Sequence, residues 1–210
     1  MKRCKKKVEN SLKRLKSDYL DILLLHWPTD EKELFKSLKR LENIKKEEKA
    51  KEIGVSNFPL CLLTKTTKDF EISFHERPLS LCWNKDYEEE SKTGIKILSY
   101  APLAFGFLSR KEEKENHFFF EKSSYKDELF NLLEKYSNKY NTSLSSISYS
   151  WVLQKNPFGI IRGVSKKEQL DIKEIELENE EIKELDLVSS KITSLSPSDN
   201  IFSHNYKGER

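Results

Sequence analysis

Apolar runs alternate with charged, helically spaced segments along most of this chain. The first run, residues 22–25, reads Ile-Leu-Leu-Leu and stops at His26, which Trp27 and Pro28 follow. An uninterrupted apolar run of this kind predicts a strand that is buried on both faces. Because the catalytic groups of parallel α/β barrels lie at the carboxyl ends of their strands, His26 is the first candidate for a functional side chain.

The same alternation of strand and helix repeats to the end of the chain. Strands are predicted at residues 20–26, 53–56, 71–76, 95–100 and 158–161. Helices are predicted over residues 8–15, 34–44, 85–92, 144–152 and 180–188, with further helix starts near Pro59 and at Ser165, where Ser-Lys-Lys-Glu has the form of a capping box. This order is typical of parallel βα units, and we expect about five of them in a single domain of residues 1–210.

The longest segment without a regular pattern covers residues 101–124 and contains an aromatic run at residues 118–120. Long loops in compact domains are usually either functional or disordered. Since this one follows a strand, a lid or binding loop is the preferred interpretation.

The composition fits a globular enzyme and argues against two classes of partner. Hydrophobic residues make up 36% of the chain and aromatic residues 11%, which is enough for a buried core. With 38 basic and 35 acidic side chains, the net charge of +3 gives no general field that would attract nucleic acid or membrane. The basic cluster in residues 2–7 is interpreted as the solvated face of a helix.

Neither a secretion signal nor a membrane span is expected. No apolar segment follows the basic cluster, and no apolar stretch approaches the ~20 residues that span a bilayer, so we expect a cytoplasmic protein. Cys4, Cys61 and Cys82 have no C-x-x-C spacing, which indicates neither a disulfide framework nor a zinc site. His75 has no partner spaced for a metal and is interpreted as incidental.

Three further segments carry groups that could bind a ligand. Gly163 and Ser165 precede a predicted helix, where backbone N–H groups favour an anion, and a plain N-cap at Ser165 is the alternative. Ser56 and Asn57 end a strand and could either reach into a barrel mouth or form an Asx turn. Tyr100 could stack on a ligand or pack at the rim.

Taken in order, these segments resemble the aldo-keto reductase family. Residues 17–28, from Ser-Asp-Tyr-Leu to His-Trp-Pro, closely resemble the segment of its fourth barrel strand. Residues 53–58, Ile-Gly-Val-Ser-Asn-Phe, resemble the segment that contacts the nicotinamide carboxamide. Residues 99–108 are similar to the segment in which a tyrosine stacks on the nicotinamide and the next loop straps the pyrophosphate. Residues 160–170, with Ile-Ile-Arg-Gly before Glu-Gln-Leu, look like the segment that binds the adenosine phosphate of NADP(H).

The resemblance implies both a fold and a reaction. The fold would be α/β, a TIM (β/α)8 barrel that is incomplete, with roughly the last five βα units present. The reaction would be NAD(P)H-dependent reduction of a small aldehyde or ketone to an alcohol, with NADP(H) as cofactor and NAD(H) left open. By match to the family's motifs, His26 would orient the carbonyl. The cofactor contacts would be Ser56, Asn57, Glu76, Tyr100, Leu103, Gly106, Gly163, Ser165 and Gln169.

Three matched positions differ from the family's usual residues. Glu76 stands in place of a glutamine that contacts the carboxamide, Arg162 in place of a proline, and Gln169 in place of an arginine for the 2′-phosphate. The first change puts nicotinamide affinity in question. The last leaves the preference between NADPH and NADH open.

The aspartate, tyrosine and lysine of the family's site have no match in this chain, because they lie on the first three strands. We therefore expect an amino-terminally shortened product or a fragment of a longer gene. Its activity alone would be low or absent, since a lost general acid costs about 10²–10⁴-fold in rate. The alternative is a noncatalytic remnant that binds a nucleotide or a partner protein. Unpaired apolar edges at residues 20–26 and 158–161 would favour self-association.

Overall fold

The computed structural model describes residues 2–109 and 125–195 of the chain, and these residues divide into two compact units. The first unit holds the described residues up to Arg77 together with Lys92–Ile97. The second unit holds Pro78–Ser91 and the described residues from Leu98 onward. Each unit has its own parallel strands and its own covering helices.

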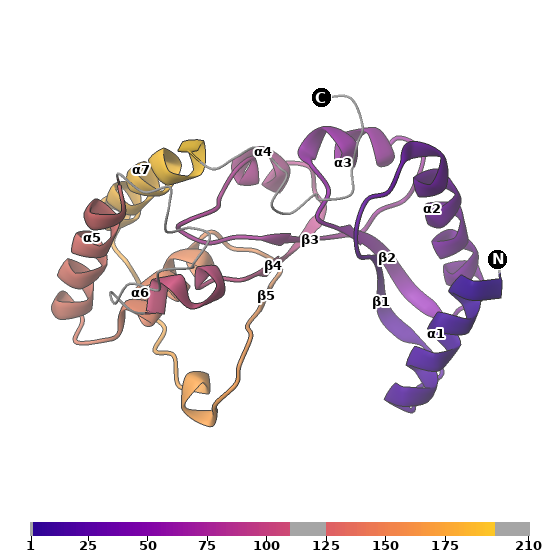
Figure 1. Cartoon of the computed structure of the whole chain (residues 1–210), viewed down its shortest axis with the longest axis horizontal. Coiled ribbons are helices and arrows are strands. Elements are labelled where there is room, and N and C mark those ends of the chain that lie inside the picture. The colour runs from indigo at the N-terminus through magenta and orange to yellow at the C-terminus, as the bar shows by residue number, and fades with distance from the viewer. Residues whose placement is uncertain (1, 110–124, 196–210) are drawn as a thin grey trace. The chain divides into compact units, whose positions relative to one another are not determined.

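The first unit alternates helices with parallel strands (Figure 1). Its elements are α1 (Lys2–Leu15), β1 (Leu20–Leu25), α2 (Glu31–Lys46), β2 (Ala50–Ser56), α3 (Leu60–Thr66) and β3 (Phe74–Pro78). β1 pairs with β2, with Leu25 opposite Val55, and β2 pairs with β3, with Ser56 opposite Glu76. Parallel neighbours that are joined through helices confirm the predicted βα repeat.

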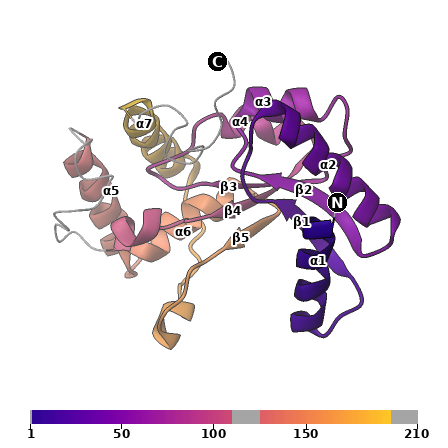
Figure 2. The ribbon, with the colours of Figure 1, turned by 45° about the vertical axis from the view of Figure 1, so that its right-hand side comes forward.

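The apolar faces of the helices form the core of the first unit on one side of its strands. One cluster joins α2, β2 and α3 and consists of Leu34, Leu38, Val55, Phe58, Leu62, Leu63, Phe70 and Ile72. A second cluster joins α1 to α2 and β2 through Val8, Ile44 and Ala50, with Leu20 and Leu23 of β1 packed against it. α1 and α2 accordingly lie beside β1 and β2 in both views (Figures 1 and 2).

Gly54 allows the first three strands to approach one another closely. A Cβ atom at this position would lie 2.4 Å from the backbone oxygen of Phe74 and 2.7 Å from Cδ2 of Leu24. Leu24, Gly54 and Phe74 are register partners across β1, β2 and β3. The side chain of Leu24 therefore occupies the space above β2 that a larger residue would need.

The second unit contains β5 (Gly159–Ile161) and the part of β4 (Lys96–Tyr100) from Leu98 onward, and Tyr100 lies opposite Ile161. Its other elements are α4 (Tyr87–Ser91), η1 (Ala104–Ser109), α5 (Lys126–Lys139), α6 (Leu144–Gln154), η3 (Lys167–Leu170) and α7 (Asn179–Leu195). α5 and α7 lie side by side (Figure 1) and are linked by the Tyr136 hydroxyl, which donates to Glu184 Oε2 at 2.6 Å. Trp151 Nε1 donates to Asp186 Oδ1 at 2.8 Å and so ties α6 to α7.

Most predicted elements are present, and two differ. The third strand was expected at residues 71–76 but runs from Phe74 to Pro78, because Ile72 packs into the helix cluster and residues 71–73 form the connection. The helix expected from Ser165 is only the four-residue 3₁₀ turn η3. Of the expected lid, residues 104–109 form η1, and residues 110–124 lie outside the described residues. No helix within residues 2–109 or 125–195 has both the length and the apolar character of a membrane span.

Candidate functional site

Four of the candidate residues gather at the carboxyl ends of the strands of the first unit. His26 directly follows β1, and Ser56 is the last residue of β2. Glu76 in β3 is the register partner of Ser56, and Asn57 begins the connection from β2 to α3. This end of a parallel sheet is where α/β barrels bind their ligands.

A chain of hydrogen bonds joins these four residues. The Asn57 side-chain nitrogen donates to the backbone oxygen of His26 at 2.9 Å and to Ser56 Oγ at 3.0 Å. Ser56 Oγ in turn donates to Glu76 Oε1 at 3.3 Å. Since a primary amide has two N–H protons, these two bonds use both donors of the Asn57 side chain. The carboxylate of Glu76 suits this position, because it accepts the hydrogen bond that the Ser56 hydroxyl donates.

The backbone of the Asn57 turn is held from the neighbouring strand. Asn57 has a φ angle of +61°, a left-handed conformation that asparagine tolerates better than most residues. The Asn57 N–H donates to the backbone oxygen of Glu76 at 3.0 Å. The Phe58 N–H donates to Nε2 of His75 at 3.1 Å. The sequence pattern indicated no contact of this kind for His75. Its position next to Glu76 was the one sign that it would lie near the candidate residues.

The side chain of His26 itself is exposed to solvent. Its ring lies 5.8 Å from the ring of Trp27, centroid to centroid, with the two planes tilted by 55°. The backbone of His26 is therefore fixed by Asn57, while its imidazole is open to a ligand.

A second group of candidate residues follows β4 in the second unit. Tyr100 ends the strand and is half-buried, and the backbone then coils tightly through η1. Leu103 provides the oxygen that accepts from the N–H groups of Gly106, at 2.9 Å, and Leu108, at 3.2 Å. Ala104, Phe105 and Gly106 all have positive φ angles, of 47°, 56° and 89°. For the two non-glycine residues this conformation is strained, and such strain clusters in ligand-binding loops.

The last candidate residues lie on an exposed coil after β5. Oε1 of Gln169 accepts hydrogen bonds from the N–H of Ser165 at 2.7 Å, from the hydroxyl of Ser165 at 3.2 Å, and from the N–H of Lys166 at 3.0 Å. Gly163 is exposed, and a Cβ atom there would meet nothing within 4 Å. The guanidinium of Arg162 lies 4.9 Å from the centre of the Tyr149 ring.

Both groups present hydrogen-bonding atoms at the ends of strands. In the second unit, three donors converge on Oε1 of Gln169, and backbone turns hold an oxygen of a phosphate group in a similar way. In the first unit, the side chains of Asn57, Ser56 and Glu76 form one continuous hydrogen-bonded series. Within the described residues, no three His, Cys, Asp or Glu side chains gather in a way that could hold a metal ion.

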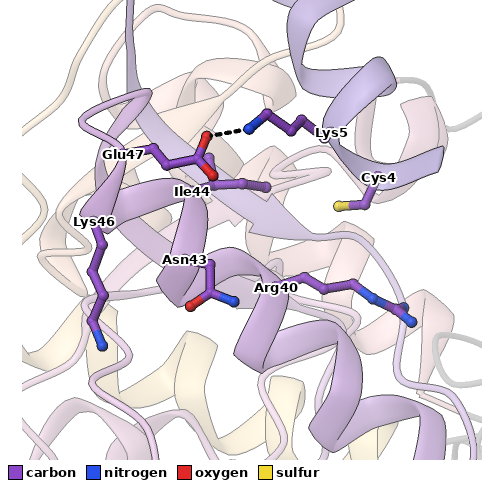
Figure 3. Close-up of a pocket in the computed structure, with 7 residues that line it drawn as sticks. All are labelled: Cys4, Lys5, Arg40, Asn43, Ile44, Lys46 and Glu47. Atoms are coloured by element: carbon purple, nitrogen blue, oxygen red, sulfur yellow. Dashed lines mark ion pairs between the residues drawn. The ribbon is translucent and has the colours of Figure 1, made fainter. Parts of the chain in front are cut away.

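A separate cavity of about 300 Å³ lies between α1 and α2 (Figure 3). It is lined by Cys4, Lys5, Arg40, Asn43, Ile44, Lys46 and Glu47. An ion pair of 2.8 Å between Lys5 and Glu47 spans its rim. The cavity shares no residue with the two candidate groups.

Comparisons with known proteins show the family of this chain. The family model described as "Aldo/keto reductase family" matches residues 1–189. Glyoxal reductase of Bacillus subtilis (strain 168) is 31% identical over 192 residues, which cover 86% of this chain and 61% of that protein. Methylglyoxal reductase DkgB of Escherichia coli O157:H7 is 27% identical over 177 residues, which cover 78% of this chain and 57% of that protein. The chain thus spans about three fifths of the length of these relatives.

Solved structures give the same result for the fold. Glycerol dehydrogenase AKR11B4 from Gluconobacter oxydans superposes with a TM-score of 0.77 at 24% identity, over 93% of this chain and 65% of that one. The thermostable aldo-keto reductase Tm1743 superposes with a TM-score of 0.70 at 25% identity, over 86% of this chain and 64% of that one. The βα units described above are accordingly those of an incomplete barrel of this type, and the chain belongs to the Aldo/keto reductase family.

Proposed function

We propose that this protein takes part in the NAD(P)H-dependent reduction of a small aldehyde or ketone to an alcohol. Its family is one of oxidoreductases, and two of its relatives are named for the reduction of glyoxal and methylglyoxal. Small dicarbonyl compounds of this kind are therefore the first substrates to test. Because the family model matches across both units, we also propose that residues 1–210 act as one partial barrel domain.

The observation that carries this proposal is the hydrogen-bonded chain from His26 through Asn57 and Ser56 to Glu76. It fixes the side chains of Ser56, Asn57 and Glu76, and the backbone of His26, at one end of the strands. In this proposal Ser56, Asn57 and Glu76 bind the carboxamide of the nicotinamide. The exposed imidazole of His26 donates a hydrogen bond to the carbonyl oxygen of the substrate and so orients it for reaction.

The remaining candidate residues would hold the rest of the cofactor. Tyr100 would stack on the nicotinamide ring, and the coil with Leu103 and Gly106 would follow the pyrophosphate. Gly163, Ser165 and Gln169 would contact the adenosine end. The bound nicotinamide supplies the hydride, and the protein supplies the orientation of the substrate. Gln169 carries no charge, so NADH remains a cofactor to test beside NADPH.

We further propose that residues 1–210 alone turn over slowly. No side chain of this chain matches the family's aspartate, tyrosine or lysine, so the carbonyl oxygen would have no positioned proton donor of that kind. General acid catalysis is typically worth about 10²–10⁴-fold in rate. Cofactor binding should be affected less than turnover.

The test is the oxidation of NADPH, and in parallel of NADH, with methylglyoxal as substrate, followed through the absorbance of the reduced nicotinamide. We expect slow turnover that His26→Ala lowers by about 10²-fold in kcat/KM. Tyr19→Phe is the matched control, because Tyr19 is exposed next to the opposite end of β1. A rate that His26→Ala leaves unchanged would contradict the role of His26.

A second candidate function is a noncatalytic module that binds the nucleotide or a partner protein. The observation that favours it is Glu76, a carboxylate at the position where the family usually has a glutamine that contacts the nicotinamide carboxamide. Isothermal titration with NADPH separates the two proposals. Binding without any oxidation of NADPH, for every carbonyl compound tested, would favour the module.

A further inference from the structure

His75 is a buried histidine to which no role in the reaction has been given. It lies in β3 with 1% of its surface exposed. Its Nε2 accepts a hydrogen bond from the Phe58 N–H at 3.1 Å. A ring nitrogen accepts a hydrogen bond through its lone pair, so this bond needs an Nε2 that carries no proton.

The turn that His75 contacts is the one that carries the candidate nicotinamide contacts. Two successive backbone N–H groups of the turn donate to two successive residues of β3: Asn57 to the oxygen of Glu76, and Phe58 to the ring of His75. The first of these bonds is a backbone contact that any sequence could make. The second depends on the histidine side chain.

The Phe58 bond also bears on the conformation of Asn57. Asn57 is held at a φ of +61°, which is less favourable than an extended or helical conformation for a residue other than glycine. In this conformation the Asn57 side chain reaches the backbone oxygen of His26, directly after the neighbouring strand β1. A turn without the Phe58 bond would be free to relax, and the amide of Asn57 would leave both His26 and Ser56.

We propose that His75 is a positioning residue for the nicotinamide end of the site. As the acceptor for the Phe58 N–H, it holds the turn of Ser56, Asn57 and Phe58 in the conformation in which Asn57 bonds to His26 and Ser56. This inference rests on the proposed function, because it assigns the turn to cofactor binding. His75 itself touches neither cofactor nor substrate.

Two substitutions separate this role from packing alone. His75→Leu keeps an apolar body but provides no acceptor. His75→Gln provides an oxygen at nearly the position of Nε2 and can restore the bond. We expect His75→Leu to weaken NADPH binding about 10-fold, which corresponds to about 1.4 kcal/mol. We expect His75→Gln to bind within about 3-fold of the wild type. The affinity for 2′,5′-ADP, which has no nicotinamide, should be the same in all three proteins.

A control variant accounts for a general loss of stability. Ile44→Ala removes a buried side chain from the second apolar cluster of the first unit, which contains neither Phe58 nor His75. It should lower the melting temperature and leave the NADPH affinity unchanged. If Ile44→Ala and His75→Leu weaken NADPH binding equally, the proposal is wrong and His75 only packs.

A measurement on the free protein distinguishes a failure of this inference from a failure of the proposed function. Amide hydrogen exchange at Phe58 should be at least about 10-fold faster in His75→Leu than in the wild type, and slow again in His75→Gln. Wild-type protein that does not bind NADPH, but shows this pattern, overturns the assigned cofactor and leaves the turn assignment standing. Equal exchange at Phe58 in the two variants overturns the role of His75, whatever the nucleotide affinity.

Discussion

The two groups of candidate residues are held in different ways. In the first unit, Ser56 and Asn57 are buried, with 0% and 6% of their surface exposed, and their bonds run between three strands. In the second unit, Ser165 and Gln169 are exposed, and they bond only to each other and to the next residue of the same coil. The strand-end group is preorganised by the sheet, while the coil group depends on a single side chain.

This difference has a consequence for recognition. A preorganised group loses little conformational freedom on binding and can be selective for one ligand geometry. An exposed coil that is closed by one glutamine can open at small cost and adapt to different ligands. We therefore expect the strand-end group to be intolerant of substitution and the coil group to be tolerant.

The largest expected difference in the free energy of unfolding is between alanine substitutions at two glycines. Gly54→Ala places a Cβ atom 2.4 Å from the backbone oxygen of Phe74, whereas Gly163→Ala meets nothing within 4 Å. We expect Gly54→Ala to lower the free energy of unfolding by about 3 kcal/mol, because backbone must move. Gly163→Ala should stay within about 0.5 kcal/mol of the wild type. Urea unfolding measures the free energy of unfolding of both variants. Equal losses of stability would contradict the difference between the packed strands and the exposed coil.

The next test changes an amide to an acid in each group. Asn57 uses its amide nitrogen as a donor, so Asn57→Asp loses the bonds to His26 and Ser56. It also adds a buried negative charge near Glu76. Gln169 uses its oxygen as an acceptor, so Gln169→Glu keeps all three bonds. We expect a loss of roughly 2 to 3 kcal/mol for Asn57→Asp and less than about 0.5 kcal/mol for Gln169→Glu.

NADPH binding and unfolding in urea should be measured for both acid variants. Asn43→Asp, at an exposed position on α2, controls for the added charge. Asn57→Asp should bind NADPH more weakly than the control. A Gln169→Glu variant that unfolds more easily than Asn57→Asp would show that the coil, and not the strand ends, is the sensitive part.

The sequence predicted the strand-end group better than the coil group, for physical reasons. The run that ends at His26 and the Ile-Gly-Val-Ser-Asn segment each form a strand, since continuous burial leaves an unambiguous apolar pattern. The bonds among Asn57, Ser56 and Glu76 could not be predicted, because they depend on the register between strands. The role of His75 was missed for the same reason. At Ser165 the local pattern indicated a helix, but the side chain of Gln169 closes a short turn instead.

Alkaline pH should weaken the second unit selectively. Burial raises the pKa of Tyr136 to about 12 from 10.0, and its hydrogen bond to Glu184 raises it as well. A raised pKa stabilises the fold below the unfolded value, and this stabilisation is lost as the pH rises from about 10 through about 12. We expect the free energy of unfolding to fall by roughly 2 kcal/mol over this range, relative to Tyr136→Phe. Tyr19→Phe, at an exposed site in the first unit, should behave like the wild type in unfolding series across this range.

The smallest expected effect concerns self-association through the two edge strands, β1 and β5. β1 has six residues, of which five are apolar and half-buried, and within the described residues of the first unit it pairs only with β2. β5 has three residues and offers a much shorter edge. We propose that the protein self-associates through β1, because a long apolar edge with unpaired backbone groups is a template for another strand. Ile22→Lys puts a charge on this edge, opposite Glu52, and Ile160→Lys puts one on β5, opposite Ser99.

We expect Ile22→Lys to weaken self-association about tenfold, or about 1.4 kcal/mol, and Ile160→Lys to leave it unchanged. Sedimentation at several protein concentrations measures the association constant, and thermal unfolding checks that both variants fold. Because Glu52 lies opposite and can pair with the new lysine, we expect β1 to stay folded in Ile22→Lys. A lower molecular mass in sedimentation would then show that the edge of β1 mediates the association. If Ile160→Lys dissociates the protein and Ile22→Lys does not, the association runs through the second unit, and the first unit's edge is already covered.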